Sequence, residues 1–271
     1  MIMLKNGVPV GGLSHPLGWM VKTMPNIAVL VKRVPDTIAK ITVVDGSIDL
    51  SGVKWIISPY DEYAIESALQ HREANGGSVT AITLGNADCD KTLKDAKALG
   101  CDELVRLWQD GWESLDSNGV QSILAGAISD LGSEIVYCGK AAADTDAGST
   151  GPGVAEKLGW ASISNVVSVS FEDSGVEALV PVAGGQAKVG INFPCLLTID
   201  KGPNEPRRPN VRGIMMARKA EVNLKGGQAP AATISVISKS TPPAKPPGKT
   251  YHGAENVPAV VQALRDEANV I

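Results

Sequence analysis

Short apolar runs alternate with longer amphipathic stretches along the first part of the chain. The runs, such as IAVLV at 27–31, are typical of strands that are buried on both faces of a sheet. The expected strands are 27–31, 79–84, 103–107 and 134–138, and the expected helices are 58–75, 87–99, 116–131 and 151–158. This alternation predicts an α/β fold with a doubly wound, mainly parallel, Rossmann-like sheet and right-handed crossovers.

Local signals predict where the first helix begins and where one hairpin turns. Ser58 is expected to cap the helix, and Pro59 suits the first helical position. Asp61 and Glu62 favour the positive end of the helix dipole. Further upstream, the Asp45-Gly46 pair lies between two short strand-like runs and predicts a tight hairpin turn.

The pattern changes after Trp160. Strand-like runs at 165–171, 176–182, 186–191 and 195–199 have no helix between them, which predicts antiparallel additions to the sheet. The basic stretch 201–222 is expected to be irregular, and 241–249 (TPPAKPPGK) to be a semi-rigid linker. An amphipathic helix over 255–268 is expected to dock on its own domain or on another chain. The expected division is a flexible N-terminal extension at 1–23, a domain at 24–222, and a linker with a C-terminal helix at 223–271, which together form a C-terminal arm.

Composition removes several classes of protein. With 44% apolar residues and a net charge of −4, the chain is neither disordered nor a nucleic-acid binder. No run approaches the ~20 apolar residues that span a bilayer, so we expect no membrane insertion. The four cysteines are widely spaced and read as reduced thiols, and the three histidines form no ligand set. The chain has no G-x-S-x-G, P-loop or H-E-x-x-H motif, so we expect neither a catalytic nor a metal site.

The segment 138–159, CGKAAADTDAGSTGPGVAEKLG, is the best candidate for a binding loop. It leaves the carboxyl end of an expected strand, where open α/β sheets bind ligands, and its small residues allow a phosphate to approach the backbone. Ser149 and Thr150 would add hydroxyl donors at the helix start, whereas Asp144 and Asp146 would repel a phosphate unless they point away. The alternative is an ordinary helix that Ser149 or Thr150 caps. Lys32 follows the first strand, where it either approaches a phosphate or is simply solvated.

Four segments in this order resemble the beta subunit of electron transfer flavoprotein, the FixA family: VLVKRVPDT at 29–37, SPYDEYAIESAL at 58–69, 138–159 as quoted above, and NEPRRPNVRGIM at 204–215. The likeness runs over about 24–222 and implies a Rossmann-like, adenine nucleotide alpha hydrolase-like fold. It implies an electron carrier rather than an enzyme, with AMP bound in this subunit. It also implies a heterodimer with an alpha subunit that holds most of the FAD. Electrons would pass from flavin dehydrogenases to a quinone oxidoreductase or another acceptor.

The resemblance also assigns individual residues. Carried over one by one, the AMP-binding positions are Leu30, Ser58, Pro59, Tyr60, Asp61, Leu84, Gly139, Lys140, Ala141, Ala142, Ala143, Asp144, Thr145, Asp146, Ala147, Gly148, Ser149 and Thr150. The partner-docking positions are Arg207, Arg208, Val211, Arg212, Ile214 and Met215. Val211 stands at the apolar anchor position within a basic rim, a common arrangement for a binding hot spot.

Two other functions stay open at this stage. In the bifurcating subset of the family a second FAD replaces AMP and NADH is the donor; the short SPYD helix start at 58–61 favours AMP. The other function is a small nucleotide-binding regulatory module similar to universal stress proteins. The basic segment 204–215 and the C-terminal helix argue against this module. We expect a cytoplasmic location in a prokaryote and the mitochondrial matrix in a eukaryote.

Overall fold

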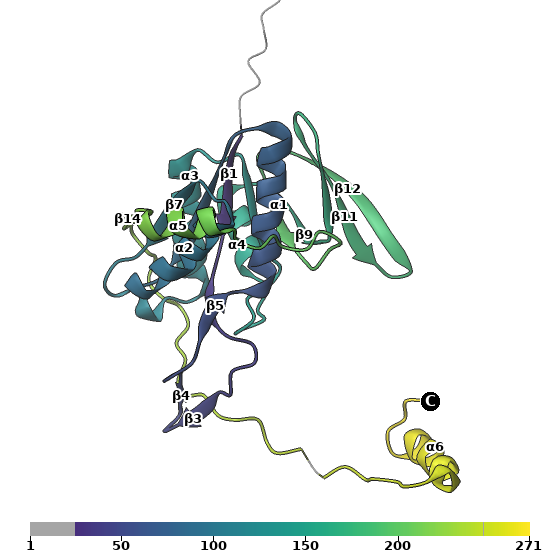
Figure 1. The fold of residues 1–271 in the computed structure, drawn as a ribbon. Coiled ribbons are helices and arrows are strands. Elements are labelled where there is room, and N and C mark those ends of the chain that lie inside the picture. Colours follow the sequence, from purple (N-terminus) through teal and green to yellow (C-terminus); the bar gives the residue numbers. More distant parts are fainter. Residues whose placement is uncertain (1–24, 246) are drawn as a thin grey trace, which may run out of the picture. The chain divides into compact units, whose positions relative to one another are not determined.

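A computed structural model describes residues 25–245 and 247–271. The extension expected at 1–23 lies outside these residues. The described chain divides into a main unit, 25–40 with 50–236, and a second unit, 41–49 with 237–271. Figure 1 shows the order of the elements along the chain.

A seven-stranded sheet forms the centre of the main unit, with strand order β14-β7-β6-β1-β8-β13-β9. Its strands are β1 (Asn26–Leu30), β6 (Ser78–Leu84), β7 (Glu103–Leu107), β8 (Ile135–Gly139), β9 (Ala161–Val166), β13 (Cys195–Ile199) and β14 (Asn223–Lys225). Every pairing in this sheet is parallel. The strand order reverses at β1, which pairs with β6 on one side and β8 on the other, so the sheet has a topological switch point there.

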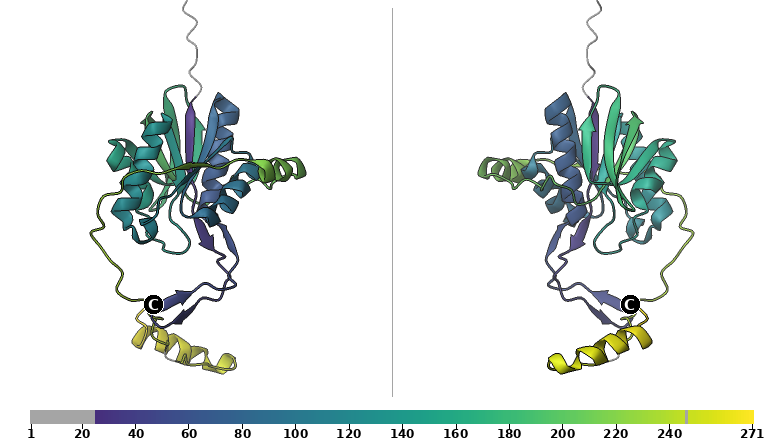
Figure 2. Two further views of the ribbon diagram at one scale, coloured as in Figure 1. Left: turned by 90° about the vertical axis from the view of Figure 1, so that its left-hand side faces the viewer. Right: turned by 90° about the vertical axis from the view of Figure 1, so that its right-hand side faces the viewer.

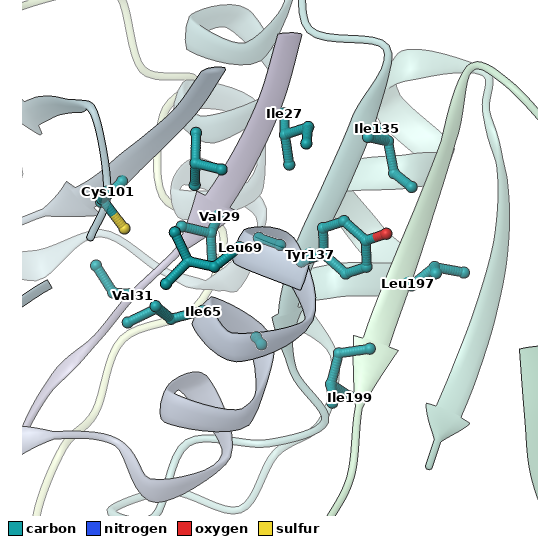
Figure 3. Packing of buried hydrophobic residues seen from close by; sticks show 14 of the residues in the cluster. Ile27, Val29, Val31, Ile65, Leu69, Cys101, Ile135, Tyr137, Leu197 and Ile199 are labelled. Carbon is teal, nitrogen blue, oxygen red and sulfur yellow. The ribbon is translucent and has the colours of Figure 1, made fainter. Parts of the chain in front are cut away.

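Helices cover both faces of the sheet, as the two views in Figure 2 show. They are α1 (Pro59–Asn75) and α2 (Asp90–Leu99) on one face and α3 (Ser117–Leu131) and α4 (Thr150–Leu158) on the other. The side chains of β1 alternate between the two apolar clusters, with Val29 on the α1 face and Leu30 on the α3 face. In Figure 3, Val29, Leu69 of α1 and Tyr137 of β8 lie together in the first cluster. The expected doubly wound α/β fold is confirmed.

The strands after Trp160 do not all join as expected. β10 (Ser168–Phe171), β11 (Gly175–Val182) and β12 (Gly185–Asn192) form a separate antiparallel sheet. β13 is instead a parallel member of the central sheet, so the prediction of an antiparallel addition is wrong for 195–199. β9, most of which lies before the expected run at 165–171, also pairs in parallel in the central sheet. All five side chains of β13 are buried, the sign of a central parallel strand, but a hairpin rather than a helix precedes it.

Two elements occupy a region that was expected to be irregular. α5 (Val211–Lys219) packs on α2, and β14 follows it. Asn210 caps α5, because its Oδ1 accepts the Gly213 N–H at 2.8 Å. A Cβ on Gly213 would lie 2.5 Å from the Ala98 carbonyl oxygen, so this glycine permits the close approach of α5 to α2. The prediction of an irregular 201–222 is wrong because the cap signal of Asn210 lies among basic residues and prolines.

The remaining short elements of the main unit are β2 (Arg33–Pro35), which pairs with β5 (Trp55–Ile57), and the 3₁₀ turns Ala87–Cys89 and Trp112–Ser114. The first of these turns begins the helix expected over 87–99. Among the described residues, none of the helices combines the length and apolarity that crossing a membrane requires.

The second unit contains a hairpin and a helix. β3 (Thr42–Val44) and β4 (Ser47–Asp49) meet at Asp45 and Gly46, whose φ angles are 49° and 74°, as the Asp-Gly signal predicted. α6 (Val257–Asp266) follows a 3₁₀ turn at Ala254–Asn256. No side chain of α6 is buried within the described chain, and Val257 is 56% exposed. Docking of this helix on another chain therefore stays a prediction.

Candidate functional site

A cavity of about 380 Å³ lies at the carboxyl edge of the central sheet, beside the switch point. We call it the edge cavity. The ends of three neighbouring strands reach it, with Leu30 from β1, Leu84 from β6 and Gly139 from β8. Parallel strands bring their carboxyl ends to one edge, so residues far apart in sequence converge there. The position is the one at which open α/β sheets bind ligands.

One wall of the edge cavity is apolar. The first two turns of α3 supply Ser117, Val120 and Leu124, and Leu115 lies two residues before the helix. Leu30 and Leu84 at the strand ends line the same cavity. An apolar wall of this kind suits a flat aromatic ring such as a nucleobase.

A second part of the lining is the loop from β8 to α4, which is built from small residues. Gly148, Ser149 and Thr150 line the cavity where α4 begins. Ser149 stands at the cap position of α4, but its side chain makes no capping hydrogen bond. Gln121 of α3 donates from Nε2 to the Ser149 carbonyl oxygen at 3.0 Å and so links α3 to the start of α4. A helix start with hydroxyl side chains can bind an anion, because its N–H and O–H groups donate hydrogen bonds to it.

A buried carboxylate joins two of the strand ends. Asp61, at the third position of α1, accepts the Lys32 N–H on Oδ2 at 2.8 Å and the Gly139 N–H on Oδ1 at 2.9 Å. Burial raises the pKa of Asp61 from 3.8 to about 7, against the lowering effect of these two hydrogen bonds and of the Lys32 charge. Asp61 lines the edge cavity, so the charge of the cavity lining changes near neutral pH.

The charged side chains of the loop point to partners rather than across the cavity. The Lys32 ammonium pairs with Asp144 at 2.8 Å, and the Lys140 ammonium pairs with Asp200 at 2.9 Å. Asp146 has a positive φ of 49° in the turn. Neither Asp144 nor Asp146 lines the edge cavity, so these carboxylates do not close it to an anion.

Most of the sequence-predicted nucleotide residues meet at the edge cavity. Those that line it are Leu30, Asp61, Leu84, Gly139, Lys140, Ala141, Ala142, Thr145, Ala147, Gly148, Ser149 and Thr150. Those that do not are Ser58, Pro59, Tyr60, Ala143, Asp144 and Asp146. The members of the second group lie at or just before the start of α1, or in the loop.

Ser58 does not cap α1 with its side chain, so that expectation is wrong. The residue is fully buried at the cap position, and its Oγ accepts the Ala143 N–H at 3.3 Å. The backbone oxygen of Ser58 receives the Asp61 N–H instead. Ser58 therefore links the loop to α1.

Sequence reasoning missed the wall that α3 provides. The lining residues outside the prediction are Val31, Lys32, Ile82, Thr83, Leu115, Ser117, Val120, Leu124, Cys138 and Gly151. For Lys32 the sequence leaves open an approach to a phosphate or simple solvation, and the structure places the residue in the lining and its ammonium beside Asp144. Ser117, Val120 and Leu124 follow helical spacing just after β7, so their common face at the carboxyl edge is a signal that the sequence carries.

The predicted docking residues lie on or before α5 and divide into two groups. Val211 is 76% exposed and Met215 is 60% exposed, and Arg208 and Arg212 are exposed beside them. Ile214 is exposed as well. These residues form an apolar strip with a basic rim, which we call the α5 surface.

Arg207 differs from the other docking residues because α1 already binds it. Its guanidinium contacts Glu66 at 2.8 Å and Glu73 at 2.6 Å, and its backbone N–H donates to Glu66. The Glu66 side chain is only 8% exposed. Arg207 therefore holds the chain before α5 against α1 rather than presenting a free charge.

Cys89, Cys101, Cys138 and Cys195 are all free thiols and all buried. Burial raises the pKa of Cys101 to about 12. No cluster of histidine, cysteine or carboxylate side chains suited to a metal ion occurs within 25–245 and 247–271.

Comparison with known proteins gives a consistent result. The profile of the electron transfer flavoprotein domain matches residues 45–225. The chain is 35% identical to the electron transfer flavoprotein subunit beta of Bacillus subtilis, covering 91% of this chain and 100% of the relative. It is 32% identical to the subunit of the same name from Thermoanaerobacterium thermosaccharolyticum, covering 90% and 98% of the two chains. It is also 32% identical to the protein FixA of Sinorhizobium fredii, covering 73% and 72%.

Proposed function

This chain belongs to the electron transfer flavoprotein beta subunit (FixA) family, and from that premise we propose that it binds AMP in the edge cavity as the structural subunit of a heterodimeric electron carrier. The family consists of electron carriers and not of enzymes. In the proposed heterodimer an alpha subunit holds the FAD, which supplies the electron-carrying chemistry. This chain's own residues bind a nucleotide and shape the surfaces on which partners dock.

The edge cavity is the observation that carries the proposal. Its apolar wall, with Leu115, Val120 and Leu124, suits the adenine ring. The start of α4, with Ser149 and Thr150, suits the phosphate, because a helix N-terminus and hydroxyl donors favour a negative charge. The volume of about 380 Å³ is near the lower end of the range of about 300–1,000 Å³ for ligand sites, which favours a mononucleotide over a dinucleotide.

The charges around the cavity also support a monophosphate. Lys32 and Lys140 are each neutralised by a carboxylate, so the site offers hydroxyls, backbone and a helix start rather than a cluster of free cations. A polyphosphate would bring more negative charge than these groups balance. Asp61, with a pKa of about 7, is partly neutral at neutral pH and so repels a phosphate less than an ordinary carboxylate would.

Analysis of the bound nucleotides tests this proposal. The chain is produced together with its alpha partner, the complex is purified, and the ligands are extracted and quantified. We expect one FAD and one AMP per heterodimer. Two FAD and no AMP would replace the proposal by a bifurcating carrier with NADH as donor, and a stable ATP-binding homodimer without flavin would replace it by a regulatory module.

The α5 surface is proposed to dock the flavin dehydrogenases that deliver electrons and, in turn, the quinone oxidoreductase or other acceptor. Val211 and Met215 supply exposed apolar contact, and the rim of Arg208 and Arg212 would steer an acidic partner. The α6 helix, whose stripe includes Val257 and Leu264, is proposed to pack on the alpha subunit. This stripe has no buried residue in the described chain, which is what a segment that folds against a partner would show.

A further inference from the structure

Asp116 lies between the edge cavity and the segment 226–236, which we call the exit segment because it leads out of the main unit. Its Oδ1 accepts the Gly119 N–H at 2.9 Å and so caps α3. Its Oδ2 accepts the Thr233 N–H at 2.7 Å, the Thr233 hydroxyl at 2.9 Å and the Ile234 N–H at 3.3 Å. One carboxylate therefore holds a helix start with one oxygen and the exit segment with the other.

The turn that Asp116 caps is also a wall of the edge cavity. Leu115 precedes the cap, Ser117 is the first residue of α3, and Val120 follows one turn later, and all three line the cavity. The cap stabilises this turn by satisfying one of its free N–H groups. A ligand packed on these side chains would order the same turn.

The chain just before the exit segment is held by the central sheet, whereas the exit segment itself pairs with no strand of the described chain. β14 pairs with β7, and the Trp108 N–H donates to the Lys225 carbonyl oxygen at 3.0 Å. Beyond this point, 227–232 and the loop 109–115 line a second, open hollow of about 480 Å³, and Leu115 lines both this hollow and the edge cavity. Ile234 is 71% exposed and Val236 is 72% exposed. Ala229 packs against the apolar cluster on the α3 face, and the bonds to Asp116 add a second attachment further along the exit segment.

We propose that Asp116 couples nucleotide binding in the edge cavity to the position of the exit segment. When the exit segment leaves, the carboxylate loses three donors and rotates toward solvent, the first turn of α3 loosens, and the apolar wall of the cavity is less well formed. A nucleotide that packs on this wall has the opposite effect and strengthens the hold on Thr233 and Ile234. The coupling is reciprocal, as linkage between two binding events requires. It rests on the proposed function, since it needs a nucleotide in the edge cavity.

The titration of Asp116 is consistent with a permanent link rather than a pH switch. The N–H of Gly119, followed by the N–H and hydroxyl of Thr233, lowers the pKa of Asp116 to about 2. The carboxylate is therefore charged throughout the neutral range. We expect the hydrogen bonds from Thr233 and Ile234 to Asp116 to be unchanged between about pH 6 and 8.

Asp116→Asn separates the two roles of the side chain. The amide oxygen of asparagine still accepts the Gly119 N–H and caps α3, but its NH₂ group cannot accept a bond from Thr233 or Ile234. Thr233→Pro is the complementary variant: it removes both donors of Thr233 in a stretch outside any helix or strand and leaves Asp116 intact. Asp130→Asn, an exposed carboxylate at the far end of the same helix, is the matched control.

Two measurements on the full chain test the coupling. Calorimetric titration with AMP is expected to give an affinity at least about fivefold lower for Asp116→Asn and for Thr233→Pro than for Asp130→Asn. Hydrogen exchange at the amides of Thr233 and Ile234 is expected to slow severalfold when AMP binds to the unmodified chain and to the Asp130→Asn variant.

The outcomes distinguish the coupling from the function on which it rests. If the unmodified chain binds AMP but both variants bind it as tightly as the control, the coupling is wrong and the nucleotide site stands. The same conclusion follows if AMP leaves the exchange of Thr233 and Ile234 unchanged. If the unmodified chain binds no AMP at all, both proposals are overturned.

Discussion

At the residue scale, the contact between Gly139 and Asp61 shows how the edge cavity is held open. Gly139 ends β8, and its N–H donates to the buried carboxylate of Asp61, which also receives the Lys32 N–H at the end of β1. A Cβ at position 139 would lie 2.5 Å from Asp61 Oδ1 and 2.8 Å from Tyr60 Cβ. The absence of a side chain at this one position therefore lets α1 begin directly against the two strand ends.

Gly139→Ala is expected to lower the free energy of unfolding by about 1–3 kcal/mol, since the added methyl group must displace the start of α1. Urea denaturation measures the change. The matched variant is Gly126→Ala in α3, where nothing lies within 4 Å of the new Cβ. There alanine is expected to raise stability by about 0.5–1 kcal/mol through its helix propensity. Equal effects at the two glycines would contradict the close contact at Gly139.

Ser149→Ala combined with Thr150→Ala tests the phosphate end of the cavity. A hydrogen bond to a charged group contributes about 1.5–3 kcal/mol, so the double variant is expected to bind AMP at least about tenfold more weakly. Nucleotide content after purification and calorimetric titration both report this. Ser129→Ala, near the far end of α3, serves as the control. Unchanged AMP retention by the double variant would remove the phosphate role from these hydroxyls.

At the scale of elements, α5 illustrates how a surface is built from a short helix and an internal ion pair. Arg207 ties the preceding chain to Glu66 and Glu73 on α1, and Asn210 caps the helix. The close approach at Gly213 then fixes α5 on α2. These contacts fix the position of α5, so Val211 and Met215 are free to stay exposed to solvent.

Val211→Glu is expected to slow electron transfer from the partner dehydrogenase about tenfold or more, because a charge replaces the apolar anchor of the proposed docking surface. Stopped-flow reduction of the flavin by the dehydrogenase measures the rate, and the FAD content is expected to stay unchanged. Val182→Glu places the same charge on another exposed valine, on β11, and is expected to leave the rate unaltered. Equal rates for the two variants would eliminate the anchor role of Val211.

At the scale of the whole molecule, the burial of one carboxyl group makes stability depend on pH. Asp61 titrates at about 7 in the folded chain and near 3.8 when unfolded, so the folded state binds the proton more tightly between these values. Its stabilising contribution is complete below about pH 4 and is lost as the pH rises through 7. This is opposite to the usual effect of a paired carboxylate.

Asp61→Asn isolates this contribution, because asparagine does not titrate. The free energy of unfolding of the unmodified chain is expected to fall relative to the variant between about pH 5 and 7, by at most about 1.4 kcal/mol per pH unit. The quantity to compare is the slope, since the variant also loses one acceptor for the Lys32 or Gly139 N–H. Chemical denaturation at several pH values provides it. Parallel pH profiles for the two proteins would show that Asp61 is not held in its neutral form.

The sequence by itself determined the main helices and the central-sheet strands of the first half of the chain, together with the loop that lines the edge cavity. The strand and helix signals of 26–158 are local, because periodicity, caps and glycines act over a few residues, and the small residues of 139–150 mark the loop in the same way. The family resemblance added the α5 surface, whose helix the local pattern had not indicated.

Tertiary structure alone decided which distant groups meet. Lys32 pairs with Asp144, which is 112 residues away in sequence; Asp116 binds Thr233, 117 residues away; and Arg207 binds Glu66, 141 residues away. It also decided that β9 and β13 run parallel to β8 and that α3 supplies a wall of the edge cavity. A charged side chain has many possible partners of similar intrinsic strength along a chain. Only the packing of the sheet and its helices brings one of them within hydrogen-bonding distance, so no local pattern could have named it.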